Sequence, residues 1–221
     1  HDLGIDTLGE YAHALGLGVS TGIELVETTG NMSNAANHMD YAGSEWRIGD
    51  TLQAAIGQSD SVFTPLQLAE YCAAVANNGE RHSASILKSI RNYDYSEKVY
   101  ERQDEVLSTV ESPQYNWDAI HEGMKEVINS PLNETNYLNF YDCAVTVAGK
   151  TGTAQKGEGI KNDGLFICYA PYEDPEIAVA VVVERGHAGA SVGFIARQIV
   201  DVYLNIRSYS NTSESEMSLL K

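Results

Sequence analysis

The chain has 221 residues, 43% of them hydrophobic, and a formal net charge of −17. This length and composition fit one globular domain with a sizeable core. The acidic balance argues against a nucleic-acid partner, because phosphate binding requires clustered Lys and Arg side chains.

The first half of the chain predicts two helices separated by loops. Thr7 and Glu10 have the spacing of a capping box, so a short helix is expected to start there and to end near Gly16. Residues 28–45 are polar, rich in Gly and Asn and without a clear period, which predicts a surface loop. Thr64-Pro65 places a capping hydroxyl before a proline and predicts the start of a largely buried helix that ends at Asn77-Asn78-Gly79.

Residues 83–110 contain two short strand-like stretches, and helical periodicity follows from Trp117 to Ile128. Three strand candidates then come in close order, joined by short connections that predict an antiparallel meander. They are Cys143–Thr153, Leu165–Ala170 and Ile177–Glu184. The third strand is apolar on both faces, which is typical of a sheet interior.

A closing helix is expected from Ser191 to Leu204, with Ile195, Ile199, Val202 and Tyr203 as its apolar stripe. The last residues are rich in Ser and Glu. The predicted organisation is therefore one domain over residues 1–207 and a disordered tail over 208–221. The three cysteines lie in apolar runs without C-x-x-C spacing and are expected to be buried thiols, and no metal site or cofactor is indicated.

The segment from Val147 to Gln155 is the strongest functional signal. Lys150-Thr151-Gly152-Thr153 combines a cation, two hydroxyls and a glycine on a predicted strand. Strand alternation sets Thr151 and Thr153 on one face, where they can bind a carboxylate, and the long Lys150 side chain can reach the same place. If the strand lies at a sheet edge, the Thr153 N–H can stabilise an oxyanion, and Gly152 permits close approach of a ligand.

The order of several further segments makes the chain resemble the C-terminal part of the transpeptidase domain of class B penicillin-binding proteins. The matching segments extend from about Leu3 to Leu204. They are Leu15–Gly18, Thr21–Leu25, Gly49–Thr51, Ala55–Gln58, Thr64–Ala69, Val147–Gln155, Tyr169–Pro171 and Pro175–Ala180. Ser59 departs from this pattern, because the family usually has glycine at that position.

The resemblance implies an α/β fold of the α+β type, with an antiparallel sheet flanked by helices. It also implies peptidoglycan D,D-transpeptidation through an acyl-serine intermediate. Lys150 and Thr153 are then the expected catalytic residues, and Thr151, Gly152 and Thr153 the substrate-binding residues. The expected partners are D-Ala-D-Ala stem peptides and β-lactams, at the extracytoplasmic face of the bacterial membrane.

Two family motifs, S-x-x-K with the nucleophile and S-x-N, normally precede the region that this chain resembles. No S-x-N occurs, and the S-x-x-K match at Ser85–Lys88 lies in a strand-like stretch rather than at a helix start. The chain is therefore expected to have an incomplete sheet, to lack a nucleophile and to be inactive alone. Its unpaired sheet edge is expected to pair with the missing N-terminal part of the protein or with a second copy.

Two other functions stay open at this stage. One is a non-enzymatic β-lactam sensor or scaffold with the same fold. The other is a nucleotide-binding protein that uses Gly149-Lys150-Thr151 as a phosphate loop. The stiff β-branched residues before Gly149 and the absence of a helix signal after Thr151 argue against the phosphate loop.

Overall fold

The computed structural model of the chain describes residues 3–157 and 159–210. The chain divides into two compact units, His1–Ala119 and Ile120–Lys221, and the boundary falls within one helix, α5. The elements of the first unit are α1 (Ile5–Ala14), α2 (His38–Ala42), α3 (Ile48–Ala55), α4 (Pro65–Ala76), β1 (Glu80–His82), β2 (Ser89–Arg91), β3 (Lys98–Glu101) and β4 (Val106–Thr109).

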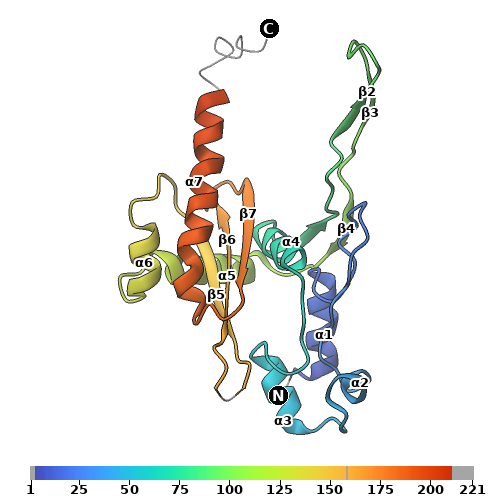
Figure 1. The fold of residues 1–221 in the computed structure, drawn as a ribbon, viewed down its shortest axis with the longest axis vertical. Coiled ribbons are helices and arrows are strands. Elements are labelled where there is room, and N and C mark those ends of the chain that lie inside the picture. The colour runs from blue at the N-terminus through green and yellow to red at the C-terminus, as the bar shows by residue number, and fades with distance from the viewer. Residues whose placement is uncertain (1–2, 158, 211–221) are drawn as a thin grey trace. The chain divides into compact units, whose positions relative to one another are not determined.

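Two small antiparallel sheets belong to the first unit. In one of them β1 pairs with β4, and in the other β2 pairs with β3. Figure 1 shows that the β2–β3 hairpin projects away from β1 and β4 as a long arm. The two strand-like stretches predicted within residues 83–110, around Ser85–Ile90 and Glu97–Tyr100, therefore correspond to the β2–β3 hairpin, whereas the β1–β4 pair was not predicted.

Helix α4 confirms the prediction from Thr64-Pro65. The Thr64 side chain accepts a hydrogen bond from the Gln67 N–H, and the Gln67 side chain accepts one from the Thr64 N–H. Pro65 occupies the first helical position, where its missing N–H costs nothing. The helix ends at Ala76, and Asn78 and Gly79 both adopt left-handed backbone angles after it.

Helix α1 corrects the predicted capping box. The helix starts at Ile5 with Gly4 at the N-cap, so Thr7 and Glu10 are already inside it, and no side chain caps its first turn. Gly4 has φ +80°, a conformation open to glycine at little cost. The start of helix α1 is therefore determined by the backbone conformation of Gly4 rather than by a capping hydroxyl.

The predicted surface loop of residues 28–45 is wrong in part. Asn31 forms both backbone hydrogen bonds of an antiparallel bridge with Val62, and helix α2 begins at His38. The His38 imidazole is buried, with Nδ1 at 2.5 Å from the Asp60 carboxylate. Polar residues are buried here because each finds a hydrogen-bond partner some 20 to 30 residues away, which local periodicity cannot reveal.

The second unit contains a three-stranded sheet with the order β5-β6-β7. Its elements, with α5 crossing from the first unit, are α5 (Gln114–Asn129), α6 (Glu134–Phe140), β5 (Ala148–Ala154), β6 (Asp163–Ala170), β7 (Ile177–Val183), the 3-10 helix η1 (Gly189–Val192) and α7 (Gly193–Ser210). Both strand pairs are antiparallel, which confirms the predicted meander.

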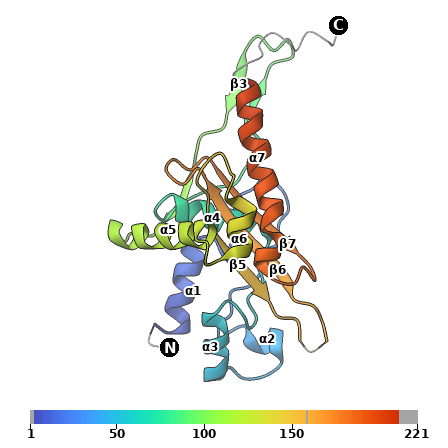
Figure 2. The same cartoon turned by 90° about the vertical axis from the view of Figure 1, so that its left-hand side faces the viewer.

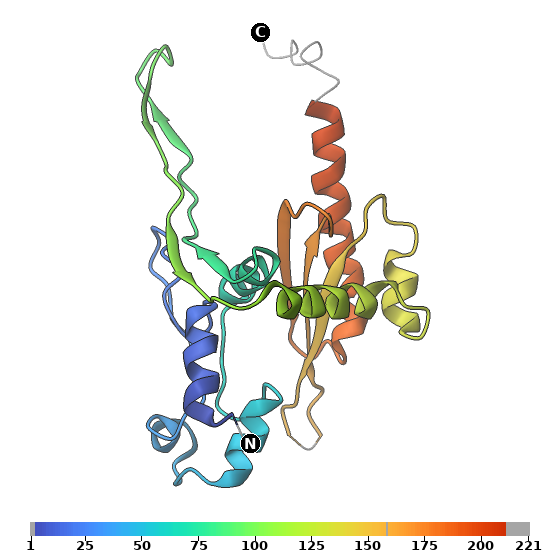
Figure 3. The same ribbon diagram turned by 180° about the vertical axis from the view of Figure 1, so that it is seen from behind.

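One face of this sheet carries the core of the second unit. The buried residues alternate along the strands, with Phe166 and Cys168 on β6 facing the same side as Val181 and Val179 of β7. Phe140 of α6 stacks on Phe166, with the ring centroids 5.7 Å apart. Helix α7 packs along β6 and β7, as Figure 2 shows, and α5 crosses the strands in Figure 3.

Two expectations for this unit need correction. Strand β5 starts at Ala148, not at Cys143. Strand β7 pairs only with β6 among the described residues, which agrees with the expected unpaired edge of an incomplete sheet. The buried side of the closing helix is formed by Val192, Ala196 and Val200, whereas Ile199 and Val202 of the expected stripe are exposed.

The helix boundary also bears on the predicted tail. Helix α7 extends to Ser210, three residues into the segment predicted as disordered. The remainder of that segment, residues 211–221, lies outside the described residues.

Of the cysteines, Cys72 and Cys168 are buried as expected, and Cys143 is partly buried. Burial raises the pKa of the Cys168 thiol to about 12.

Candidate active site

The segment Lys150-Thr151-Gly152-Thr153 lies within β5, which has one strand neighbour, β6, in the described sheet. The register pairs Lys150 with Ile167, Thr151 with Phe166, Gly152 with Leu165 and Thr153 with Gly164. Among the described residues, the segment therefore lies on an edge strand, as the sequence analysis required.

The register also assigns the side chains to faces of the sheet. Directly paired residues point to the same side, so Thr151 shares the face of the core residue Phe166, and Lys150 shares the opposite face with Ile167. Thr151 is half-buried, whereas Lys150 and Thr153 are exposed. The two hydroxyls lie on one face, as alternation predicts, but they differ in access to solvent.

The Lys150 side chain bends back to its own strand. Its Nζ donates a hydrogen bond to the Thr151 carbonyl oxygen at 2.7 Å. This places the ammonium beside the strand backbone although the Cβ belongs to the opposite face from the two hydroxyls. The flexible four-carbon stem makes such a position possible, and it keeps a positive charge next to the hydroxyl-bearing segment.

Two further residues shape the segment, Gly189 in the turn that follows β7 and Asp163 at the start of β6. The Gly189 N–H donates to Thr153 Oγ1 at 3.3 Å, and Gly189 is buried. At the end of β5, Lys156 Nζ pairs with the Asp163 carboxylate at 2.7 Å. Hydrogen bonds from the Lys156 ammonium and from the Arg185 N–H lower the pKa of Asp163. Sequence reasoning gave no role to Gly189 or Asp163.

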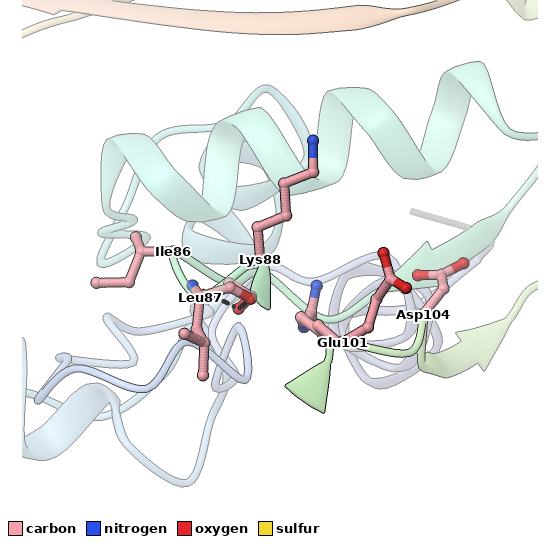
Figure 4. A pocket seen from close by; sticks show the side chains of 7 residues that line it. Ile86, Leu87, Lys88, Glu101 and Asp104 are labelled. Atoms are coloured by element: carbon pink, nitrogen blue, oxygen red, sulfur yellow. Dashed lines mark hydrogen bonds between the residues drawn. The ribbon is translucent and has the colours of Figure 1, made fainter. Parts of the chain in front are cut away.

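The S-x-x-K match at Ser85–Lys88 lies in the first unit, in the loop that enters β2. Ser85 Oγ donates a hydrogen bond to the Glu24 carboxylate and accepts one from the Leu87 N–H. Ser85 lines a shallow pocket in which Lys88 extends away from Leu87 (Figure 4). The serine is not at a helix start, which supports its rejection as a nucleophile.

A second S-x-x-K match, Ser218-Leu219-Leu220-Lys221, escaped the sequence analysis. It lies outside the described residues.

The phosphate-loop hypothesis places Gly149, Lys150 and Thr151 in a loop before a helix, but all three lie inside β5. An extended strand cannot wrap its N–H groups around a phosphate, so this alternative has no geometric support.

Three acidic residues of the first unit have structural contacts. Glu24 accepts a hydrogen bond from the Ile86 N–H, Glu27 accepts one from the Thr21 N–H, and Asp50 accepts one from the Arg47 N–H at the start of α3. Residues 3–157 and 159–210 contain no cluster of three or more His, Cys, Asp or Glu side chains suited to a metal ion. Within the same ranges, no helix has the length and apolarity needed to cross a membrane.

Comparison with known proteins gives one consistent family. The penicillin binding protein transpeptidase domain family matches residues 1–201. Peptidoglycan D,D-transpeptidase MrdA of Haemophilus influenzae is 32% identical over 94% of this chain, which covers 34% of that protein. The chain therefore spans about a third of the length of this curated relative.

Solved structures agree with the sequence matches. The Pseudomonas aeruginosa PBP2 structure superposes with a TM-score of 0.78 at 30% identity, covering 92% of this chain and 45% of that chain. Penicillin-binding protein A from Mycobacterium tuberculosis, solved as an imipenem acyl-enzyme complex, gives a TM-score of 0.69 at 27% identity, covering 90% of this chain and 42% of that one.

Proposed function

Since this chain belongs to the transpeptidase domain family of penicillin-binding proteins, we propose that it is the C-terminal part of a serine-type peptidoglycan D,D-transpeptidase. The observation that carries the proposal is the K-T-G-T segment on an edge strand, within a family match that covers nearly the whole chain. The name of the relatives, peptidoglycan D,D-transpeptidase, supports the reaction class.

In the proposed reaction, a serine from outside this chain attacks the carbonyl carbon between the two D-Ala residues of a stem peptide. An acyl-serine ester forms, the peptide bond breaks, and the terminal D-Ala leaves with the proton on its amine. A neighbouring stem-peptide amine then attacks the ester, an amide forms, and the serine recovers its proton. β-Lactams acylate the same serine because they mimic the dipeptide.

The residues of β5 have distinct proposed roles in this reaction. Lys150 and the hydroxyls of Thr151 and Thr153 bind the terminal carboxylate of the substrate. The Thr153 N–H stabilises the oxyanion that develops on the attacked carbonyl. Gly152 allows the substrate to approach the strand backbone closely. The chain as a whole is negatively charged and would repel an anionic substrate. The Lys150 ammonium is the local positive charge that attracts the terminal carboxylate of the substrate.

The complete parent protein provides the test. Lys150→Ala should reduce acylation by a fluorescent penicillin by orders of magnitude, while the exposed Lys161→Ala in the same unit should leave it near normal. Near-normal acylation of the Lys150→Ala protein would refute the role of Lys150. Acylation of the wild type without cross-linking of stem peptides would instead favour the sensor or scaffold.

We further propose that the 221-residue chain alone is inactive and does not form a stable monomer. Strands β5 and β7 are both edges of the described sheet, and β7 is a run of apolar residues. In the parent, another segment of the protein would cover the β7 edge. Isolated chain is expected to associate through this edge and to take no label from a fluorescent penicillin. A monodisperse monomer with a cooperative thermal transition would contradict the first expectation, and labelling the second.

A further inference from the structure

The turn between β7 and η1 packs directly on the backbone of the K-T-G-T strand. A methyl group added at Gly189 would lie 2.3 Å from the Leu165 carbonyl oxygen, 2.4 Å from the Gly152 carbonyl oxygen and 2.6 Å from the Gly152 nitrogen. These atoms are backbone and cannot rotate away. Only glycine at position 189 therefore allows the turn and the strand to keep their present separation.

The same turn also contacts the Thr153 side chain. The Gly189 N–H donates to Thr153 Oγ1 at 3.3 Å, so the rotamer of this hydroxyl is linked to the position of the turn. One buried glycine thus touches the backbone of Gly152 and the side chain of Thr153, two of the residues assigned to substrate binding.

Asp163, at the start of β6, anchors the turn. Its Oδ1 accepts a hydrogen bond from the Arg185 N–H at 2.9 Å, and its Oδ2 pairs with Lys156 Nζ at 2.7 Å. The neighbouring Asn162 carbonyl oxygen accepts a hydrogen bond from the His187 N–H at 3.0 Å. The Asp163 carboxylate therefore connects the end of the β5–β6 hairpin, through Lys156, to the turn after β7, through Arg185.

The turn holds two residues in an unfavourable conformation. Arg185 has φ 57° and His187 has φ 70°, in the left-handed region, which costs a non-glycine residue about 1–2 kcal/mol. A strained backbone conformation of this kind persists only where surrounding contacts hold it in place. The hydrogen bonds that the Arg185 and His187 N–H groups donate to residues 162 and 163 are such contacts, and they fix where Gly189 meets β5.

We propose that Gly189 and Asp163 are positioning residues that hold Gly152 and Thr153 in the geometry required for acyl transfer. This inference rests on the proposed function. Neither residue needs to touch the substrate: Gly189 acts through the β5 backbone and the Thr153 hydroxyl, and Asp163 acts through the turn. Because oxyanion stabilisation requires donors within a few tenths of an ångström of their ideal positions, a small shift of β5 lowers the acylation rate.

The first test replaces Gly189 in the complete parent protein. Stopped-flow acylation by a fluorescent penicillin separates the binding constant of the first complex from the acylation rate constant. Gly189→Ala should lower the acylation rate constant at least tenfold and change the binding constant much less, because the lost interactions strengthen in the transition state. Gly123→Ala is the matched control: a methyl group there has open space and the residue lies inside helix α5.

The second test uses a pair of variants at Asp163, which decides the matter if the Gly189→Ala protein does not fold. Asp163→Asn keeps an oxygen acceptor for the Arg185 N–H and should acylate within about threefold of wild type, whereas Asp163→Ala should lose at least tenfold. Thermal unfolding identifies the folded variants.

The inference is overturned if folded Gly189→Ala acylates like wild type, or if Asp163→Asn and Asp163→Ala behave alike. The Lys150→Ala variant shows whether a failure concerns the proposed function or only the positioning role of Gly189 and Asp163. If that variant acylates normally, or if wild type does not acylate, the proposed function fails and the inference with it. If Lys150→Ala is inactive while Gly189→Ala is normal, only the positioning role fails.

Discussion

A buried carboxyl group in the first unit should make the stability of the protein fall as pH rises. Glu70 lies on α4 with only 7% of its surface exposed, and within the described part of the chain neither carboxylate oxygen makes a hydrogen bond. The nearest cation is Arg81, whose Nη1 lies 3.5 Å from Glu70 Oε2. Burial raises the pKa of Glu70 to about 7, against the opposing effect of Arg81.

The sign of the effect follows from proton binding. The folded state holds the Glu70 proton more tightly than the unfolded chain, in which the pKa is 4.5. Stability is therefore highest when Glu70 is protonated in both states, decreases as pH rises from about 4.5 through about 7, and is level above that. A pKa displacement from 4.5 to about 7 is equivalent to about 3 kcal/mol in full, and to about 2.5 kcal/mol between pH 5 and pH 8.

Glu70→Gln removes the titration while keeping the shape of the side chain. Arg81 keeps its hydrogen bonds to Ser108 Oγ and to the Ser20 carbonyl oxygen, so its charge is not left without partners. The variant should gain about 2.5 kcal/mol relative to wild type on going from pH 5 to pH 8. Urea unfolding of the parent protein at both pH values gives this difference, and the exposed Glu45→Gln is the charge-matched control.

The expected gain is a difference between pH 5 and pH 8 and does not depend on the absolute stability of either protein. A relative stability of Glu70→Gln and wild type that changes by less than about 0.5 kcal/mol between pH 5 and pH 8 would refute it. A gain of the same size in Glu45→Gln would also refute it, because the effect would then belong to net charge rather than to burial of Glu70.

Two further substitutions test local structure. Ser59 has φ 67°, in the left-handed region that favours glycine, so Ser59→Gly should raise stability by about 0.5–1 kcal/mol in denaturant unfolding; a loss would mean that the Ser59 side chain contributes more than its backbone strain costs. Thr64→Ala removes the acceptor of the Gln67 N–H at the start of α4 and should lower the free energy of unfolding by about 1 kcal/mol; an unchanged denaturation midpoint would show that Thr64 does not stabilise the helix.

The sequence predicted those features whose signals lie within a few neighbouring residues. Thr64, Pro65 and the Asn-Asn-Gly stop determine helix α4 because capping acts over one turn of helix. Short connections between apolar runs predicted the β5-β6-β7 meander, since such connections leave an antiparallel hairpin as the simplest pairing. The K-T-G-T segment was also found from sequence, because its residue types and its strand context are adjacent in the chain.

Tertiary structure decided the features that depend on residues far apart in the chain. Glu70 is buried against Arg81, although Glu is usually exposed, and the buried His38 is paired with Asp60. On α7, Ala196 and Val200 are fully buried and Ile195 and Leu204 pack against the same core, whereas Ile199 and Val202 are exposed.

At the candidate site, the role of Gly189 also depends on residues far from it in the chain. In the sequence it is one of 19 glycines, and no local signal shows that it packs on the backbone of β5. Its importance arises where the turn after β7 meets Gly152, 37 positions earlier, with too little room for a single carbon atom between the two backbones. Local residue preferences act over a few positions, whereas close packing is set by segments that come together only when the chain has folded.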